Sequence, residues 1–299
     1  AALEGRVRTF MALGGNLVSA MSDTERVAKA ISKIDLTVQI STKLNRSHLI
    51  TGREALILPC LGRTERDPAG FVTVENSMGL VHSSNGSLEP ASEILLSEPE
   101  IISRLGSQLY PKGPLDWNAY SDHEHTRYLI SRCIPGFEDY NTKVRSRGGV
   151  YLPNGPRDGP TWNTPSGKAY FFCHDLPERD LQDGRYILMT VRSHDQYNTT
   201  IYGMDDRYRG IYNARRVVMM NIEDMREIGV SAGQEIDLTS HWEDRKIHSE
   251  KWKVVPYDIP RGNLCSYFPE ANVLVPLEST AVDSNTPTSK WIEVSVSTR

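Results

Sequence analysis

Short apolar runs alternate with polar stretches over the first sixty residues, and their spacing changes along the chain. Arg6–Leu13 and Leu36–Ile40 are apolar or β-branched runs typical of strands. Between them, apolar positions three to four residues apart at Val27–Ile34 predict a helix, with a capping box at Ser22–Glu25. Ala55–Pro59 predicts a third strand that is short and buried. This β-α-β order predicts a partial parallel α/β (Rossmann-like) domain whose ligand site lies at the carboxyl ends of its strands.

The pattern changes twice after that sheet. Helical spacing returns at Pro90–Leu105, and residues 110–183 are rich in Pro, Gly, Trp and Tyr, with one predicted helix at Glu124–Cys133. Thr164–Phe172 predicts a turn that leads into a strand. From there, short apolar or alternating runs bounded by turns predict a closed β-barrel. These runs are Tyr186–Val191, Arg216–Asn221, Glu235–Thr239, Lys251–Tyr257 and Trp291–Val296.

We therefore expect an α/β domain over residues 1–112, an extended connection over 113–182 and a barrel domain over 183–299. The length of 299 residues exceeds one average domain and agrees with this division. The formal net charge is -4, so the chain has no general basic field that would attract nucleic acid or an anionic membrane. No apolar run approaches the roughly 20 residues that span a bilayer, which predicts that no membrane span is present.

The cysteines and histidines predict no metal centre. The four cysteines lie far apart and form no Cys-x-x-Cys pair, which argues against a zinc ribbon or an iron–sulfur cluster in this chain and favours a reduced, cytoplasmic protein. His123 and His125 have no further ligand at a suitable spacing. The chain starts at Ala1 without an initiator Met and leads almost at once into a strand, so we expect a piece of a longer polypeptide.

The stretch Leu188–Tyr202 begins as an apolar strand and then switches abruptly to polar residues. Hydrogen-bonding side chains of this kind suit phosphate oxygens and the edge of a base or pterin. A turn that satisfies only its own backbone explains the same residues, so the local chemistry leaves both interpretations open. The side chains concerned are Arg192, His194, Gln196, Asn198, Thr199 and Thr200.

Two further polar turns follow the predicted strands of the first domain. Gly14-Gly15-Asn16 can leave backbone N–H groups open to a ligand, and Thr42–His48 contributes Asn45, Arg46 and His48. Because the carboxyl ends of parallel strands meet at one edge of a sheet, we expect these donors around one crevice. An ordinary strand-to-helix turn and a solvated loop are the simpler alternatives.

Several ordered motifs resemble those of the molybdopterin oxidoreductases of the dimethyl sulfoxide reductase and formate dehydrogenase superfamily. Thr190–Arg192, running on to Asn198–Thr200, is similar to the Thr-x-Arg loop of that family, which contacts a molybdopterin guanine dinucleotide. Asn221–Gly233 is similar to its Asn-x-x-Asp-x-x-x-x-Gly-x-x-x-Gly element. Further similar segments are Pro260–Gly262, Asn272–Pro276 and Asp283–Lys290.

The first domain also takes part in this resemblance. Leu13–Asn16 and Ile57–Pro59, with Glu65, are similar to the α/β domain that precedes the barrel in the family. The longer strings Thr42–His48 and Arg192–Tyr202 resemble the formate dehydrogenase alpha-subunit-like, or YdeP-like, branch. The resemblance covers nearly the whole chain but only the C-terminal portion of such an enzyme, and it implies that the barrel is a double-psi β-barrel.

In that family a molybdenum or tungsten is held by the dithiolenes of two molybdopterin guanine dinucleotides, so the redox chemistry belongs to the cofactor. The resemblance implies that this chain contributes cofactor binding, with no catalytic residue and no metal ligand of its own. It would be inactive without the missing N-terminal domains of the same polypeptide, and its substrate would be a small molecule, formate by family inference. The alternative is a non-catalytic nucleotide-binding or regulatory protein that retains the cofactor-binding folds.

The side chains implied to contact the cofactor come from several of these motifs in both domains. His194 has two interpretations, a residue that faces the active site and a hydrogen-bonded structural histidine near the pterin. The implied contacts are Gly14, Gly15, Asn16, Thr42, Asn45, Arg46, His48, Thr190, Arg192, His194, Gln196, Asn198, Thr199, Thr200, Asn272 and Lys290.

Overall fold

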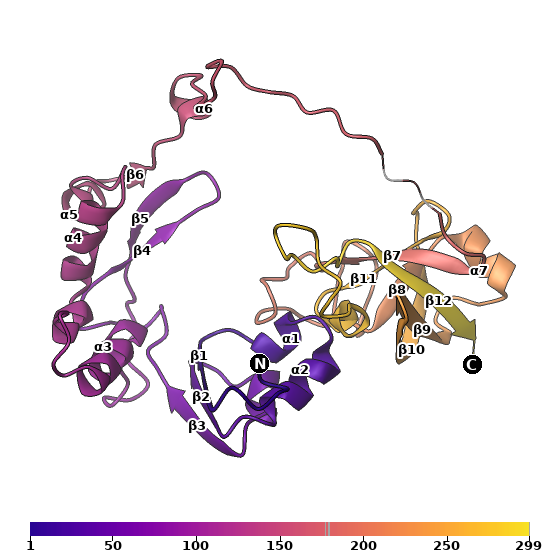
Figure 1. The fold of residues 1–299 in the computed structure, drawn as a ribbon, viewed down its shortest axis with the longest axis horizontal. Helices are drawn as coiled ribbons and strands as arrows, with labels where there is room; N and C mark the ends of the chain where they lie inside the picture. Colours follow the sequence, from indigo (N-terminus) through magenta and orange to yellow (C-terminus); the bar gives the residue numbers. More distant parts are fainter. Residues whose placement is uncertain (177, 179, 299) are drawn as a thin grey trace. The chain divides into compact units, whose positions relative to one another are not determined.

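The computed structural model describes residues 1–176, 178 and 180–298 (Figure 1). The chain divides into two compact units, one made of Ala1–Ile57 with Glu178–Arg299 and the other of Leu58–Pro177. We call the first the barrel unit and the second the middle unit. In Figure 1 the barrel unit carries the indigo and the orange-to-yellow ends of the colour scale, so it is assembled from two distant stretches of sequence.

The barrel unit begins with a small α/β layer. Its three strands form one sheet in chain order, and the first two pair in parallel. These strands are β1 (Thr9–Leu13), β2 (Leu36–Ser41) and β3 (Glu54–Pro59). The predicted parallel arrangement is therefore confirmed, and it brings the turns that follow β1 and β2 to the same edge of the sheet.

Two helices connect β1 to β2, α1 (Leu17–Ala20) and α2 (Thr24–Ile31). The apolar spacing that predicted a helix buries Val27 and Ile31 of α2 in a small core with Ile34. A helix of eight residues is marginal by itself, so its stability depends on this buried face.

Two details of the predicted α/β layer are wrong. Ala55–Pro59 does form part of β3, but every residue of that strand is exposed at the edge of the sheet. The predicted capping box of α2 is absent, because Asp23 has a left-handed backbone (φ 50°) and its side chain accepts no bond from the helix. The Asp23 carboxylate lies instead 2.5 Å from the guanidinium of Arg245.

Six strands close into the predicted barrel, in the order β10-β8-β11-β7-β12-β9. The pairs β7–β11 and β8–β10 are parallel, and the other four pairs are antiparallel. The strands are β7 (Arg185–Val191), β8 (Val217–Met220), β9 (Glu235–Trp242), β10 (Arg245–Pro256), β11 (Asn263–Tyr267) and β12 (Ile292–Thr298). The barrel was predicted from sequence, although β11 was not.

The interior of the barrel is apolar and fully enclosed. Alternate residues of each strand point inward, as the two-residue period of a strand requires. Helix α7 (Ile222–Ile228) closes one side through Met225 and ends at Gly229, whose positive φ of 73° is the left-handed cap expected of a glycine. Side chains that are 0% exposed in this core include Leu188, Met220, Ile236, Leu238, Trp252, Leu264 and Val294.

The middle unit has its own sheet and helices. Strands β4 (Val72–Glu75), β5 (Leu80–Ser84) and β6 (Val150–Tyr151) pair antiparallel. Its helices are α3 (Glu98–Leu109), α4 (His123–Cys133), α5 (Tyr140–Lys143) and α6 (Gly155–Asp158), with a 3-10 turn η2 (Trp117–Ser121). Val81, Tyr140 and Val144 form its core.

The helix predicted at Glu124–Cys133 is confirmed as α4. The strand predicted to follow the turn at Thr164 is wrong, because residues 168–176 adopt no regular structure. Three of these residues, Phe171, Phe172 and Leu176, are largely exposed, so this apolar run lacks the partner strand that its composition suggested.

Candidate functional site

The turn after β1 places Asn16 at the edge of the α/β layer. Gly14 and Gly15 both have positive φ, 65° and 73°, and nothing lies within 4 Å of a Cβ built on Gly15. Backbone conformation, rather than space, therefore requires glycine at position 15. The turn buries Asn16, whose amide Nδ2 donates to the carbonyl of Thr199 at 3.1 Å and whose Oδ1 accepts from Ser47 Oγ at 2.9 Å.

The turn after β2 is fixed by a reciprocal cap on the 3-10 helix η1 (Arg46–Leu49). Asn45 Oδ1 accepts from the backbone of Ser47 at 2.9 Å, and the backbone N–H of Asn45 donates to His48 Nδ1 at 2.9 Å. The amide Nδ2 of Asn45 donates to the carbonyl of Gly15 at 2.8 Å. The turns after β1 and β2 are thereby joined, as the sequence predicted.

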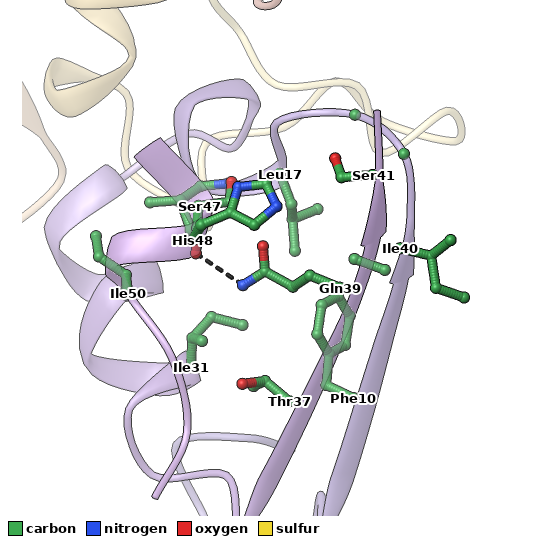
Figure 2. A pocket seen from close by; sticks show the side chains of 14 residues that line it. Phe10, Leu17, Ile31, Thr37, Gln39, Ile40, Ser41, Ser47, His48 and Ile50 are labelled. Atoms are coloured by element: carbon green, nitrogen blue, oxygen red, sulfur yellow. Dashed lines mark hydrogen bonds between the residues drawn. The ribbon is translucent and has the colours of Figure 1, made fainter. Parts of the chain in front are cut away.

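His48 carries an unpaired donor. Because its Nδ1 accepts the Asn45 N–H, the neutral ring places its proton on Nε2, and this buried atom has no hydrogen-bond partner among the described residues. Figure 2 shows the ring beside Gln39, whose amide donates to the carbonyl of Ser47 at 2.8 Å. A buried donor without a partner is costly, which makes this atom a candidate ligand contact.

The cavity around His48 is itself too small for a cofactor. It is lined by β1 and β2 residues such as Phe10 and Gln39, with Leu17 and Ile31 from the helices (Figure 2). Its volume of about 10 Å³ holds one water molecule at most. A dinucleotide would have to lie outside it, against the exposed side of the two turns.

The loop after β7 joins the same group of residues through Thr199. Arg192 Nη2 donates to Asn198 Oδ1 at 2.7 Å, and both side chains are exposed, while Thr199 is buried and Thr200 is exposed. The Asn198 backbone is left-handed, with φ 47°, a conformation that asparagine tolerates better than most residues. Arg192 and Thr200 are therefore among the side chains of this loop that remain open to solvent.

The side chain of Gln196 forms hydrogen bonds with the protein itself, mostly within the loop. Its Oε1 accepts from the backbone of Ser193 at 2.9 Å, and its Nε2 donates to the carbonyls of Asn198 and Phe268 at 2.8 and 2.6 Å. His194 lies at the surface with its ring 3.5 Å from that of Tyr208. Gln196 thus fixes the shape of the loop, which is one of the two interpretations left open by the sequence.

Arg215, which the sequence did not indicate, is a buried side chain that bonds to the loop after β7. Its guanidinium pairs with Glu270 at 3.0 Å, donates to Ser193 Oγ at 2.6 Å and to Gln196 Oε1 at 3.0 Å. The same group lies over two aromatic rings, 4.4 Å from the centre of the Tyr202 ring and 4.6 Å from that of Tyr267. Arg215 is only 5% exposed. No spacing rule connects two residues 55 positions apart, so only the folded chain reveals this pair.

Asp206 forms a second buried ionic group beside it. Burial opposes its ionisation, but hydrogen bonds from Arg209 at 2.6 Å and from the Tyr267 hydroxyl at 2.9 Å together lower the pKa of Asp206. Burial and the neighbouring Asp206 raise the pKa of Tyr267, so this hydroxyl remains a donor. The base of the loop is therefore a hydrogen-bonded framework rather than a mobile connection.

Two predicted contacts lie elsewhere on the barrel unit. Lys290 donates from Nζ to the carbonyl of Thr190, where β7 pairs with the chain leading into β12. Asn272, on the 3-10 helix η3 (Glu270–Leu274), is buried, and its amide donates to the carbonyls of Ser19 and Ala20 at 2.9 and 3.1 Å. Asn272 therefore joins the barrel to α1, and its donors face the protein.

The structure thus brings together the turn after β1, the turn after β2 and the loop after β7. Asn45 donates to the carbonyl of Gly15, and the next residue, Asn16, donates to the carbonyl of Thr199. Thr42 and Arg46 are exposed on the same turn as Asn45. No group of three or more potential metal ligands occurs within residues 1–176, 178 and 180–298. None of the helices described there is both long and apolar enough to cross a bilayer.

Sequence comparisons identify proteins that are similar to this chain. Residues 186–293 match the family described as "Molydopterin dinucleotide binding domain". The chain is 48% identical over 302 residues to a Mycobacterium tuberculosis protein named an uncharacterized oxidoreductase. It is 39% identical over 301 residues to protein YdeP of Escherichia coli. These matches cover 97% of this chain but only 39% and 40% of the two relatives, so the chain spans about two fifths of their length.

A solved structure with a similar fold is acetylene hydratase from Pelobacter acetylenicus, with a TM-score of 0.66. The similarity covers 98% of this chain and 44% of that chain at 15% identity, which supports the fold alone. The resemblance to the molybdopterin oxidoreductases and their YdeP-like branch is confirmed by these relatives. Residues 186–293 therefore match the molybdopterin dinucleotide binding domain family, within a chain that is similar over nearly its whole length to YdeP and to a mycobacterial protein named an uncharacterized oxidoreductase.

Proposed function

We propose that this chain is the C-terminal, cofactor-binding portion of an oxidoreductase of formate dehydrogenase-like type. The cofactor of that enzyme would be a molybdenum or tungsten held by two molybdopterin guanine dinucleotides. The observation that carries the proposal is the position of Asn16. Its amide bonds to Thr199 and Ser47, which joins three donor-rich turns from two distant stretches of the chain. Residues 186–293 match a dinucleotide-binding family, which supports the assignment of those donors to a dinucleotide.

The donors that remain open fit a dinucleotide. Arg192 offers a planar fork for a phosphate, and Thr42 and Thr200 offer exposed hydroxyls. The Nε2–H of His48 is buried at the cavity of about 10 Å³ and is therefore not one of these open donors. When bound, the cofactor would supply the oxidation–reduction chemistry through its metal. The residues of this chain would orient it, with Asn45 and Gln196 holding the turns in shape.

The finer parts of the proposal follow from the same family. The parallel pairs β7–β11 and β8–β10 support a double-psi arrangement of the barrel. The remainder of the polypeptide would contribute the metal ligand and the substrate pocket, and the substrate would be a small molecule such as formate. A cytoplasmic location is supported by the four cysteines, which are all free. The domain boundaries at 112/113 and 182/183 stay predictions.

The test is cofactor retention in the full-length polypeptide. Arg192→Ala should weaken dinucleotide binding about ten-fold or more, the effect of one lost charged hydrogen bond. Arg132→Ala is the matched control, because Arg132 is exposed on α4 of the middle unit. The measurements are molybdenum and tungsten by mass spectrometry and pterin by fluorescence after oxidation.

Each outcome has a separate meaning. A purified wild-type protein without metal or pterin would refute the proposal and favour a nucleotide-binding protein that retains the folds. Full retention in Arg192→Ala would remove Arg192 from the site while leaving the family assignment intact.

A further inference from the structure

The small sheet of the barrel unit has a free edge along β1. Its strand order is β1-β2-β3, so within the residues that the structure describes β1 has a strand partner on one side only. The N–H of Gly14, directly after β1, donates to the carbonyl of Ile40 on β2 at 2.8 Å. Successive residues of a strand point their backbone groups to alternate sides. The N–H and C=O groups of Met11 and Leu13 therefore face away from β2.

The side chains of β1 also lack a neighbour. Met11 and Leu13 pair in register with Val38 and Ile40, so these four side chains lie on one face of the sheet. In Figure 2, Ile40 points to the opposite side of the sheet from Gln39. Val38 and Ile40 are 6% and 1% exposed, whereas Met11 and Leu13 are 38% and 47% exposed. Exposure of apolar side chains thus rises from the middle strand to β1, and a further strand beside β1 would cover it.

Strand β1 has none of the features by which proteins protect a free edge. Its sequence, Thr-Phe-Met-Ala-Leu, contains no charged residue and no proline. A nearly continuous apolar run is typical of a strand inside a parallel sheet that is covered on both faces. The composition of β1 therefore fits the interior of a larger sheet better than its edge.

The lengths of the relatives indicate what completes the sheet. This chain spans only 39% and 40% of the mycobacterial oxidoreductase and of YdeP, so most of such a polypeptide lies outside residues 1–299. The middle unit begins at Leu58, within β3, which is the opposite edge strand of the sheet. A second copy of the chain, related by a two-fold axis, would pair with β1 antiparallel, against the parallel pairing of β1 with β2.

We propose that a strand from the upstream part of the polypeptide pairs in parallel with the free edge of β1, and that this upstream part buries Met11 and Leu13. The inference rests on one element of the proposed function, namely that this chain is the C-terminal portion of a longer polypeptide. Because Gly14–Asn16 follows β1 directly, the carboxyl end of the added strand lies beside the dinucleotide-binding turns. The upstream part therefore supplies a further wall of that site.

Hydrogen exchange in the full-length polypeptide tests the pairing without any substitution. The amides of Phe10 and Ala12 point toward β2 and are matched controls on the same strand. After correction for intrinsic rates, the amides of Met11 and Leu13 should exchange within about ten-fold of these controls, because both edges of β1 are then paired. Faster exchange at Met11 and Leu13 would mean that the edge is free and would overturn the proposal.

Photo-crosslinking identifies the segment that covers β1. Leu13 is replaced by p-benzoylphenylalanine in the full-length polypeptide, and the same replacement at Leu109, which is exposed on α3, measures non-specific crosslinking. A crosslink above this background to a peptide upstream of Ala1 supports the proposal. The proposal is overturned by a crosslink to residues 58–177, by a crosslink to a second copy in an isotope-labelled mixture, or by no crosslink above background.

Metal and pterin measured in the same preparation separate this inference from the proposed function. A polypeptide that retains both but exchanges rapidly at Met11 and Leu13 would refute only the added strand. A polypeptide with a protected β1 edge and an upstream crosslink, but without metal or pterin, would refute only the oxidoreductase function.

Discussion

Replacing Arg215 with methionine tests whether one buried guanidinium holds the loop after β7 in place. The change keeps most of the side-chain volume but leaves Glu270 without its 3.0 Å partner. Breaking a buried ion pair by removing one partner costs about 3–5 kcal/mol. The Glu270 side chain is 17% exposed and can be partly rehydrated, so the lower value of about 3 kcal/mol applies. This is a large fraction of the roughly 5–15 kcal/mol that stabilises a domain.

A double-mutant cycle separates the ion pair from the other contacts of Arg215. Glu270→Gln removes the negative charge but keeps an acceptor for the guanidinium, so its cost should be smaller than that of Arg215→Met. The double variant should recover roughly 1–3 kcal/mol as coupling energy, because the uncompensated charge is then absent. Urea denaturation gives the free energies, and hydrogen exchange at the amides of residues 193–202 reports local opening of the loop.

Two results would refute this reasoning. A destabilisation by Arg215→Met below about 1 kcal/mol would mean that the pair is effectively a surface ion pair. Unchanged exchange in residues 193–202 would mean that the loop keeps its shape through Gln196 and the backbone alone.

Two further predictions concern titrating groups. Because hydrogen bonds from Arg209 and Tyr267 lower the folded-state pKa of Asp206, its ionisation stabilises the fold at neutral pH, and this contribution is lost as the pH falls through that lowered pKa. The difference in unfolding free energy between wild type and Asp206→Asn should therefore shrink below about pH 5, and a pH-independent difference would contradict it. Iodoacetamide at pH 8 should alkylate the two exposed cysteines before the two buried ones, Cys60 and Cys265, because burial raises the pKa of both thiols to about 11. Peptide mass spectrometry measures the order of alkylation, and the reverse order would contradict this prediction.

The layout of the barrel unit could be predicted because its strands and helix carry regular patterns. Val27 and Ile31 sit four residues apart on α2, and the apolar run of β7 marks a core strand. Strand β11 was missed because its sequence, Asn263–Tyr267, mixes Cys and Ser with apolar residues and has no clear period. The capping box was predicted wrongly because the partner that takes the Asp23 carboxylate, Arg245, lies more than two hundred residues away in sequence.

The candidate site was predicted only in outline. The turns after β1 and β2 could be grouped by the rule that parallel strands end at one edge. The loop after β7 belongs to the barrel, and only the folded chain shows that Asn16 joins it to them. The sequence could not separate donors that face solvent from donors that hold the loops, as Gln196 and Asn272 do. Arg215 was missed for the same physical reason, since its partners meet only after the barrel has closed.

The barrel unit is built from two stretches that flank the middle unit, and hydrogen bonds such as that from Asn272 to Ser19 join them. For folding, the stretch from Leu58 to Pro177 acts as a tether between two halves that must find each other. The entropy of closing such a tether grows only with the logarithm of its length, so doubling it costs about 0.6 kcal/mol. That is less than one typical hydrogen bond contributes. The segment between the halves can therefore gain, lose or exchange whole elements during evolution with little effect on assembly of the barrel unit.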